Sequence, residues 1–144
     1  MTAEQLEHIA VQLRSILARM RAVTSTSLGS IDGGPHRNLP LPGSYLPKHR
    51  FGSTRDFLVH FAHGDLVPKN IMVEGSTITA VIDWEHAAFY PSFWEYCRMH
   101  DPGFMTPKWG RILEQVFPGP RRQDEIDSVH RVLTDIYWRH DLFG

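Results

Sequence analysis

The segment HGDLVPKN, residues 63–70, is the feature that most constrains what this chain can fold into. Its glycine and proline interrupt regular secondary structure, so the segment predicts a loop of fixed shape. The residues that follow form two short runs rich in branched side chains on either side of EGST, a pattern that predicts a β-hairpin. We therefore expect a polar loop, carrying Asp65 and Asn70, that feeds a hairpin ending at Asp83.

The remaining patterns predict a mostly helical α+β domain. Apolar residues recur at steps of three and four near the N-terminus, which predicts a helix with one buried face and a capping box formed by Thr2 and Gln5. The residues of this apolar stripe are Leu6, Ile9, Ala10, Leu13, Ile16, Leu17 and Met20. Strands are expected at residues 57–61, 70–74 and 78–83, and further helices at 91–99, 106–117 and 124–140.

Residues 23–54 form a long irregular segment in which Gly, Pro and Ser dominate and no period survives. Segments of this kind in a compact domain are commonly functional or disordered. We interpret this one either as a surface on the substrate side or as slack left by a deletion. A length of 144 residues fits a single domain over residues 1–144.

Composition argues against two kinds of partner. Fifteen Lys and Arg against sixteen Asp and Glu give a formal net charge of −1, so the sequence lacks the basic field that holds nucleic acid or anionic lipid. The sequence contains no apolar stretch of membrane-spanning length, and its single cysteine, Cys97, cannot form an internal disulfide. We predict a cytoplasmic protein with neither a nucleic-acid nor a membrane partner.

Asp65, Asn70 and Asp83 are the residue types that phosphoryl transfer from ATP requires. A carboxylate orients the acceptor hydroxyl and takes its proton, while other oxygen ligands hold Mg²⁺ against the phosphates. Asparagine and aspartate oxygens suit Mg²⁺, a hard cation. The spacing of five between Asp65 and Asn70 equals that of the protein-kinase catalytic loop, although Gly64 stands where that loop has arginine.

The sequences FAHGDLVPKNIMV and ITAVIDWEHAAFYPSFWEY resemble the aminoglycoside phosphotransferase and choline kinase group of protein-kinase-like enzymes, particularly its fungal members. The resemblance implies ATP- and Mg²⁺-dependent transfer to a hydroxyl of a small-molecule substrate. It implies that Asp65 is the catalytic base and that His63 braces the catalytic loop. It also implies that Asn70 and Asp83 bind the Mg²⁺ of the nucleotide, with Glu85 as a further acid near the metal.

The chain departs from this family at its N-terminal side. It begins at a helix that resembles the start of the family's C-terminal lobe, so we expect a partial phosphotransferase domain without the N-terminal lobe. The three lysines, Lys48, Lys69 and Lys108, do not lie in a strand before the catalytic loop, where the family has its phosphate-binding lysine. We therefore expect little or no activity from this chain alone, with the missing lobe supplied by a partner or by a second copy in a homo-oligomer. The alternative is a catalytically silent remnant that serves as a binding or interaction module.

Other interpretations of the same residues stay open at this point. Asp and Asn in a tight loop often only hydrogen-bond their own backbone. Several histidines near Asp65 and Asp83 could indicate a metal hydrolase, although His60 and His63 would point to opposite faces of a strand. The aromatic residues could line a pocket for a cationic substrate such as choline, but aromatics at helical spacing are more often core. These aromatic residues are Trp84, Phe89, Tyr90, Trp94, Trp109 and Trp138.

Overall fold

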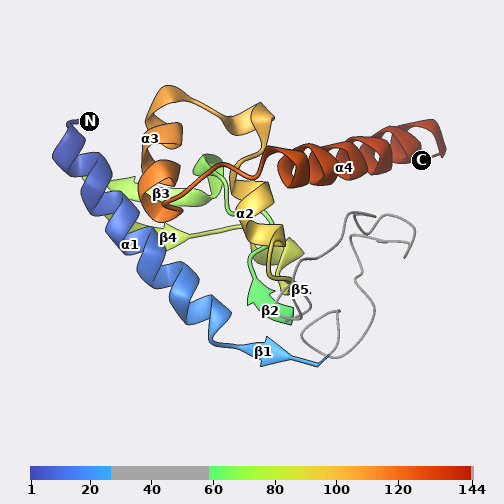
Figure 1. Cartoon of the computed structure of the whole chain (residues 1–144), viewed down its shortest axis with the longest axis horizontal. Helices are drawn as coiled ribbons and strands as arrows, with labels where there is room; N and C mark the ends of the chain where they lie inside the picture. The colour runs from blue at the N-terminus through green and yellow to red at the C-terminus, as the bar shows by residue number, and fades with distance from the viewer. Residues whose placement is uncertain (27–58, 144) are drawn as a thin grey trace.

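A computed structural model describes residues 1–26 and 59–143 of the chain, with side chains up to residue 135 (Figure 1). The fold is α+β, as the sequence predicts. Its helices are α1 (Ala3–Arg21), α2 (Trp94–Met99), α3 (Pro107–Val116) and α4 (Gln123–Phe143). Its strands are β1 (Thr24–Ser25), β2 (Val59–Ala62), β3 (Ile71–Glu74), β4 (Thr77–Val81) and β5 (Ala88–Pro91). Short 3-10 helices occupy Pro68–Asn70, Trp84–His86 and Pro102–Phe104.

The strands form two small antiparallel sheets. β2 lies between β1 and β5, and β3 pairs with β4 as the predicted hairpin. Two predicted boundaries were wrong, for local reasons. Asn70 does not begin β3, because it closes the 3-10 helix that Pro68 initiates. Asp83 lies beyond the end of β4 in a left-handed backbone conformation, which an extended strand cannot include.

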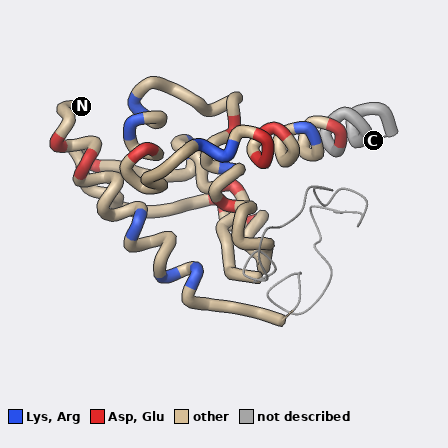
Figure 2. The backbone as a smooth tube through the Cα atoms, viewed as in Figure 1, with Lys and Arg blue, Asp and Glu red and all other residues tan. Residues whose placement is uncertain are grey.

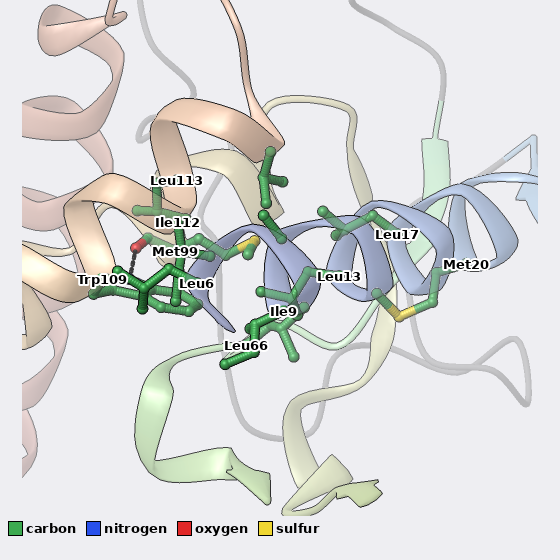
Figure 3. Close-up of a cluster of buried hydrophobic side chains, with 12 residues drawn as sticks. Leu6, Ile9, Leu13, Leu17, Met20, Leu66, Met99, Trp109, Ile112 and Leu113 are labelled. Atoms are coloured by element: carbon green, nitrogen blue, oxygen red, sulfur yellow. Dashed lines mark hydrogen bonds between the residues drawn. The ribbon is translucent and has the colours of Figure 1, made fainter. Parts of the chain in front are cut away.

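The predicted N-terminal helix is confirmed as α1, including the capping box of Thr2 and Gln5. Its apolar face packs against α3 and, with Leu66 of the polar loop, forms one hydrophobic core (Figure 3). The indole nitrogen of Trp109 donates a hydrogen bond to the Met99 carbonyl, 2.8 Å away, which ties α3 to the end of α2. In addition, Gln12 donates to the Ser76 carbonyl at 2.8 Å and accepts from the Ile78 N–H at 2.9 Å. The hairpin is therefore fixed to α1 at its turn.

A second core lies between β5, α2 and α4. The rings of Tyr90 and Trp94 stack with their centroids 5.0 Å apart, and Ile126 and Val129 cover them from α4. β5 was missed by the sequence patterns: residues 88–90 were assigned to no element, and Pro91 was assigned to the helix predicted at 91–99, which in the structure begins only at Trp94. None of the helices in the described parts of the chain is long and apolar enough to cross a membrane.

Part of the predicted irregular segment, residues 27–54, lies outside the described residues, as do residues 57 and 58 of the first predicted strand. The described beginning of the irregular segment contains one short strand, β1, which pairs with β2. β2 is therefore the central strand of its sheet, and the polar loop begins directly after it.

Candidate functional site

Glu95 of α2 fixes the start of the polar loop. Its carboxylate accepts hydrogen bonds from three backbone N–H groups: His63 at 2.6 Å, Gly64 at 3.3 Å and Leu66 at 3.3 Å. The side chain is buried, and this burial raises the pKa of Glu95 while the three N–H donors oppose the rise. A single buried carboxylate therefore sets the backbone conformation at the point where the loop leaves β2.

Gly64 is required by both conformation and space. Its φ is +81°, in the region that residues with a side chain seldom adopt. A Cβ at this position would lie 2.5 Å from the His86 carbonyl oxygen and 3.1 Å from the Tyr90 hydroxyl. These two groups are themselves joined, because the Tyr90 hydroxyl donates to the His86 carbonyl at 2.7 Å. The glycine therefore allows the loop to approach the backbone of the chain ahead of β5.

Asp65 is buried and held by three side chains. Arg98 of α2 binds its Oδ1, while Lys69 Nζ lies 3.3 Å from its Oδ2. The Asn70 amide nitrogen donates to the same Oδ2 at 3.0 Å and to the Asp65 carbonyl at 2.8 Å. Burial alone would raise the pKa of Asp65, but Arg98 and Lys69 together hold it below its usual range. The carboxylate is therefore ionised at neutral pH.

Arg98 links the loop to the rest of the domain. Besides Asp65, its guanidinium binds Asp101 Oδ2 at 2.7 Å and donates from Nε to the Gly64 carbonyl at 3.2 Å. The side chains of Arg98 and Asp65 are both buried, so removal of either one would leave the other charge without its buried partner. The protein-kinase loop has an arginine directly before the acid, at the position of Gly64 here. In this chain the arginine that contacts the acid is Arg98, which comes from α2.

His63 acts as a brace of the loop in one defined tautomer. The Asp65 N–H donates to its Nδ1 at 3.3 Å, so Nε2 must carry the proton and donates to the Ile82 carbonyl at 2.9 Å. Burial lowers the pKa of His63, which keeps the imidazole neutral and this tautomer in place. The Trp84 ring covers the imidazole with the two centroids 4.5 Å apart. The contacts are those of a residue that positions the loop.

The backbone of Ile82 joins the hairpin to the loop. Its N–H donates to the Asn70 carbonyl at 2.9 Å, and its carbonyl accepts from His63. Asp83 follows directly, exposed, with φ +62° and ψ +61°, and it is the only residue other than glycine with a positive φ in the described parts of the chain. Aspartate tolerates this conformation better than most residues, but the strain points to a functional position. The turn at Asp83 therefore directly follows the backbone contact between the hairpin and the loop.

The oxygen donors near Asn70 suit Mg²⁺. Both Nδ2 hydrogens of Asn70 are directed to Asp65, so its Oδ1 is left as the ligand atom of the amide. Asp83 lies two residues beyond β4 and is exposed. The other acid of this turn, Glu85, pairs with His86, with its carboxylate 3.4 Å from His86 Nε2. Mg²⁺ on a nucleotide needs only one or two protein oxygens besides phosphate and water. Asn70 is buried, 3% exposed, whereas Asp83 is exposed, and their roles as Mg²⁺ ligands stay a prediction.

The alternative interpretations receive little support in the described residues. These contain no group of three or more His, Cys, Asp or Glu side chains that could hold a metal ion, as a metal hydrolase would require. Among the aromatics, Tyr90, Trp94 and Trp109 are buried in the two cores. Trp84 is exposed and Phe89 half-buried, while the Trp138 side chain lies outside the described residues. Lys69 is exposed and pairs with Asp65.

Two residues of the site, Glu95 and Arg98, were not predicted from the sequence. Both lie in α2, about thirty residues after the loop, and both are buried although the helix carries the aromatic residues of a core. An acid and an arginine three residues apart within the apolar run FWEYCRM are the signal that could have identified them. Charged residues are rarely buried unless they are paired.

A model of the phosphotransferase enzyme family, APH, matches residues 44–132. The matched range covers more than half of the chain and contains the polar loop, the hairpin, Asp83 and all of α2. No curated protein and no solved structure matches the chain significantly. The family match agrees with the resemblance to aminoglycoside phosphotransferases, whereas the assignment to a C-terminal lobe and to a fungal type stays a prediction.

Proposed function

The chain belongs to the phosphotransferase enzyme family, and we propose that its polar loop transfers a phosphoryl group from Mg²⁺-bound ATP to a hydroxyl of a small molecule. The observation that carries this proposal is the double hydrogen bond of the Ile82 backbone. It joins Asn70 and His63 of the loop to the turn that bears Asp83. These hydrogen bonds connect the backbone of the loop that carries Asp65 and Asn70 to the turn that carries Asp83, and they support the proposal that the three act in one site.

Asp65 orients the acceptor hydroxyl in this proposal, through its Oδ2. Oδ1 is bound by the buried Arg98. Oδ2 accepts a hydrogen bond from Asn70 and also pairs with Lys69, whose side chain is 54% exposed. An exposed lysine can move aside at little cost, and the hydroxyl then takes its place. As the new O–P bond forms and the bond between the γ-phosphorus and its leaving oxygen breaks, the hydroxyl proton passes to Oδ2.

Asn70 and Asp83 hold the metal in the proposed site. When bound, Mg²⁺ neutralises charge on the phosphate oxygens during transfer. Asn70 contributes Oδ1, whose direction is fixed by its two hydrogen bonds to Asp65, and Asp83 contributes its exposed carboxylate. The same amide thus positions the base and binds the metal, which couples the two parts of the site.

The nucleotide-covering elements of the family are the parts that the described residues do not supply. Of the lysines in these residues, Lys69 pairs with Asp65 and Lys108 lies in α3. We propose that residues outside the described ranges or another polypeptide supply the cover, and that residues 1–144 by themselves turn over ATP slowly or not at all. Positioning and charge neutralisation supply most of the catalysis of phosphoryl transfer, so a site without a cover is weak.

A second candidate function is a silent binding module. It is favoured by the saturation of Asp65, since both of its carboxylate oxygens have partners and its pKa is lowered. A carboxylate stabilised in this way is a poor proton acceptor. The two candidates differ in whether Oδ2 becomes available when Lys69 is displaced.

Activity in the presence of a separately expressed covering lobe from a related enzyme distinguishes these candidates. Transfer from ATP to a panel of small hydroxyl compounds is followed by ³¹P NMR for the parent chain, Asp65→Asn and Lys69→Ala. The proposal expects transfer with the parent, retention in Lys69→Ala and loss in Asp65→Asn. Equal activity in all three proteins would refute the role of Asp65, and no transfer in any of them would favour the silent module.

A further inference from the structure

A pocket of about 450 Å³ opens on the domain away from the polar loop. It lies where the C-terminal end of α1, strand β2 and the connection between α3 and α4 meet, and no residue of the loop between His63 and Asn70 lines it. Its polar lining consists of Arg21, Arg122, His60 and Ser92. Figure 2 shows basic residues on the two elements concerned, at the end of α1 and just before α4.

The two arginines leave positive charge in this pocket. Partial burial and the charge of Arg122 lower the pKa of Arg21, which indicates that the two guanidinium groups lie near each other. Arg122 has one carboxylate partner, Glu125 Oε2 at 3.3 Å. Within the described residues, no carboxylate lies within 4.0 Å of the Arg21 guanidinium. The two guanidiniums have one exposed counter-charge, Glu125, and one buried counter-charge, Glu95, and their N–H groups in the pocket can bind an anion.

The geometry of Arg122 is already fixed before a ligand binds. Its guanidinium lies over the Tyr96 ring, 4.3 Å from the centroid, and its backbone N–H donates to the Tyr96 hydroxyl at 3.0 Å. A stacked guanidinium keeps its N–H edge available for oxygen acceptors in the ring plane. Less conformational freedom is then lost on binding.

The remaining lining defines the shape of a ligand. An apolar wall is formed by Val116, Phe117, Pro118 and Pro120, from the end of α3 and the connection to α4. A second cavity behind Arg21, His60 and Ser92 reaches Glu95, but at about 10 Å³ it has room for no more than a water molecule. A ligand must therefore occupy the outer pocket, with its charge at the arginines and an apolar body against this wall.

We propose that this pocket binds a small phosphomonoester with an apolar body, through Arg21, Arg122 and Ser92. Arg21 and Arg122 bind the phosphate oxygens and the Ser92 hydroxyl donates a further hydrogen bond. The site lies apart from Asp65, Asn70 and Asp83, and it does not depend on the proposed transfer reaction. The chain then has a binding site for phosphorylated molecules that is separate from the site at its polar loop.

Binding of phenyl phosphate to the full chain at constant ionic strength tests the proposal by calorimetry. Titration of inorganic phosphate measures binding of the anion alone, and titration of phenol measures binding of the apolar body alone. We expect saturable binding of phenyl phosphate, weaker binding of inorganic phosphate and none of phenol. Equal affinity for phenyl phosphate and inorganic phosphate would overturn the role of the apolar wall, and no saturable binding of either would overturn the site.

Variants locate the site and separate it from the loop. Arg21→Gln and Arg122→Gln should each weaken phenyl phosphate binding by about tenfold or more, whereas Arg14→Gln, an exposed arginine of α1 outside the pocket, should leave it unchanged. Thermal unfolding by circular dichroism verifies that each variant is folded. Amide NMR shifts on titration should centre on Ser92 and Arg122. Equal losses in all three variants, or shifts centred on residues 63–70, would refute the pocket as the site.

Discussion

Replacement of Gly64 by alanine tests the close approach that shapes the loop. The added Cβ would lie 2.5 Å from the His86 carbonyl oxygen, a backbone atom that cannot rotate away, and 3.1 Å from the His86 Cβ. The residue would also have to adopt a φ of +81°. Both costs act on the folded state, so Gly64→Ala should lower the free energy of unfolding.

The size of this loss can be worked out from its two parts. A left-handed conformation costs an alanine about 1–2 kcal/mol. An added methyl group that forces the surrounding backbone to shift costs about 1–3 kcal/mol. We therefore expect a loss of about 2–5 kcal/mol, a large part of the 5–15 kcal/mol typical of a domain.

Gly75→Ala is the matched control, because it separates the conformation from the clash. Gly75 has a φ of +63°, and a Cβ there would meet nothing within 4 Å. Urea unfolding followed by tryptophan fluorescence should show a loss of about 1–2 kcal/mol for Gly75→Ala, well below that for Gly64→Ala. Equal losses would mean that the approach of the loop to His86 does not restrict residue 64.

Glu95→Gln should lower the free energy of unfolding in urea by about 1–3 kcal/mol. The carboxylate accepts three backbone N–H hydrogen bonds, and the NH₂ group of an amide would face at least one of these donors. An unchanged urea midpoint would show that Glu95 does not anchor the loop. Arg98→Met should cost about 3–5 kcal/mol, since it leaves the buried Asp65 carboxylate with the exposed Lys69 as its remaining counter-charge, whereas Lys69→Ala should cost no more than about 0.5 kcal/mol. The lowered pKa of Asp65 means that its ion pair contributes stability above its unfolded pKa and loses it as pH falls through the folded value. Unfolding free energies measured between pH 7 and about pH 2 should therefore fall more steeply for the parent chain than for Arg98→Met.

The sequence predicts those parts of the fold that local patterns determine. The stripe from Leu6 to Met20 repeats over about four turns, so α1 and its capping box follow directly. The hairpin follows from EGST between two branched runs. β5 could not be predicted in this way, since its four residues gain their pairing only from β2, which lies far away in the sequence.

Candidate site residues could be proposed from the sequence where they are neighbours in it. The spacing of Asp65 and Asn70 indicated a catalytic loop, and the structure adds that the two side chains hydrogen-bond each other within it. The partners of Asp65 and of the loop backbone in α2, Arg98 and Glu95, depend on tertiary packing that no local pattern encodes. The strained turn at Asp83 likewise results from hydrogen bonds of the Ile82 backbone to the loop.

Calorimetric titration of ATP into the chain, with Mg²⁺ and then with excess chelator, tests most directly whether Asn70 and Asp83 hold a metal–nucleotide complex. The account predicts weak, saturable binding near millimolar, about 4 kcal/mol, that requires Mg²⁺. Asp83→Asn keeps a residue that tolerates the left-handed turn but removes the charge, and it should abolish this binding. Glu74→Gln, an exposed acid at the end of β3, is the matched control and should bind as the parent does. Binding that persists without Mg²⁺, or that Asp83→Asn leaves unchanged, would contradict the central claim.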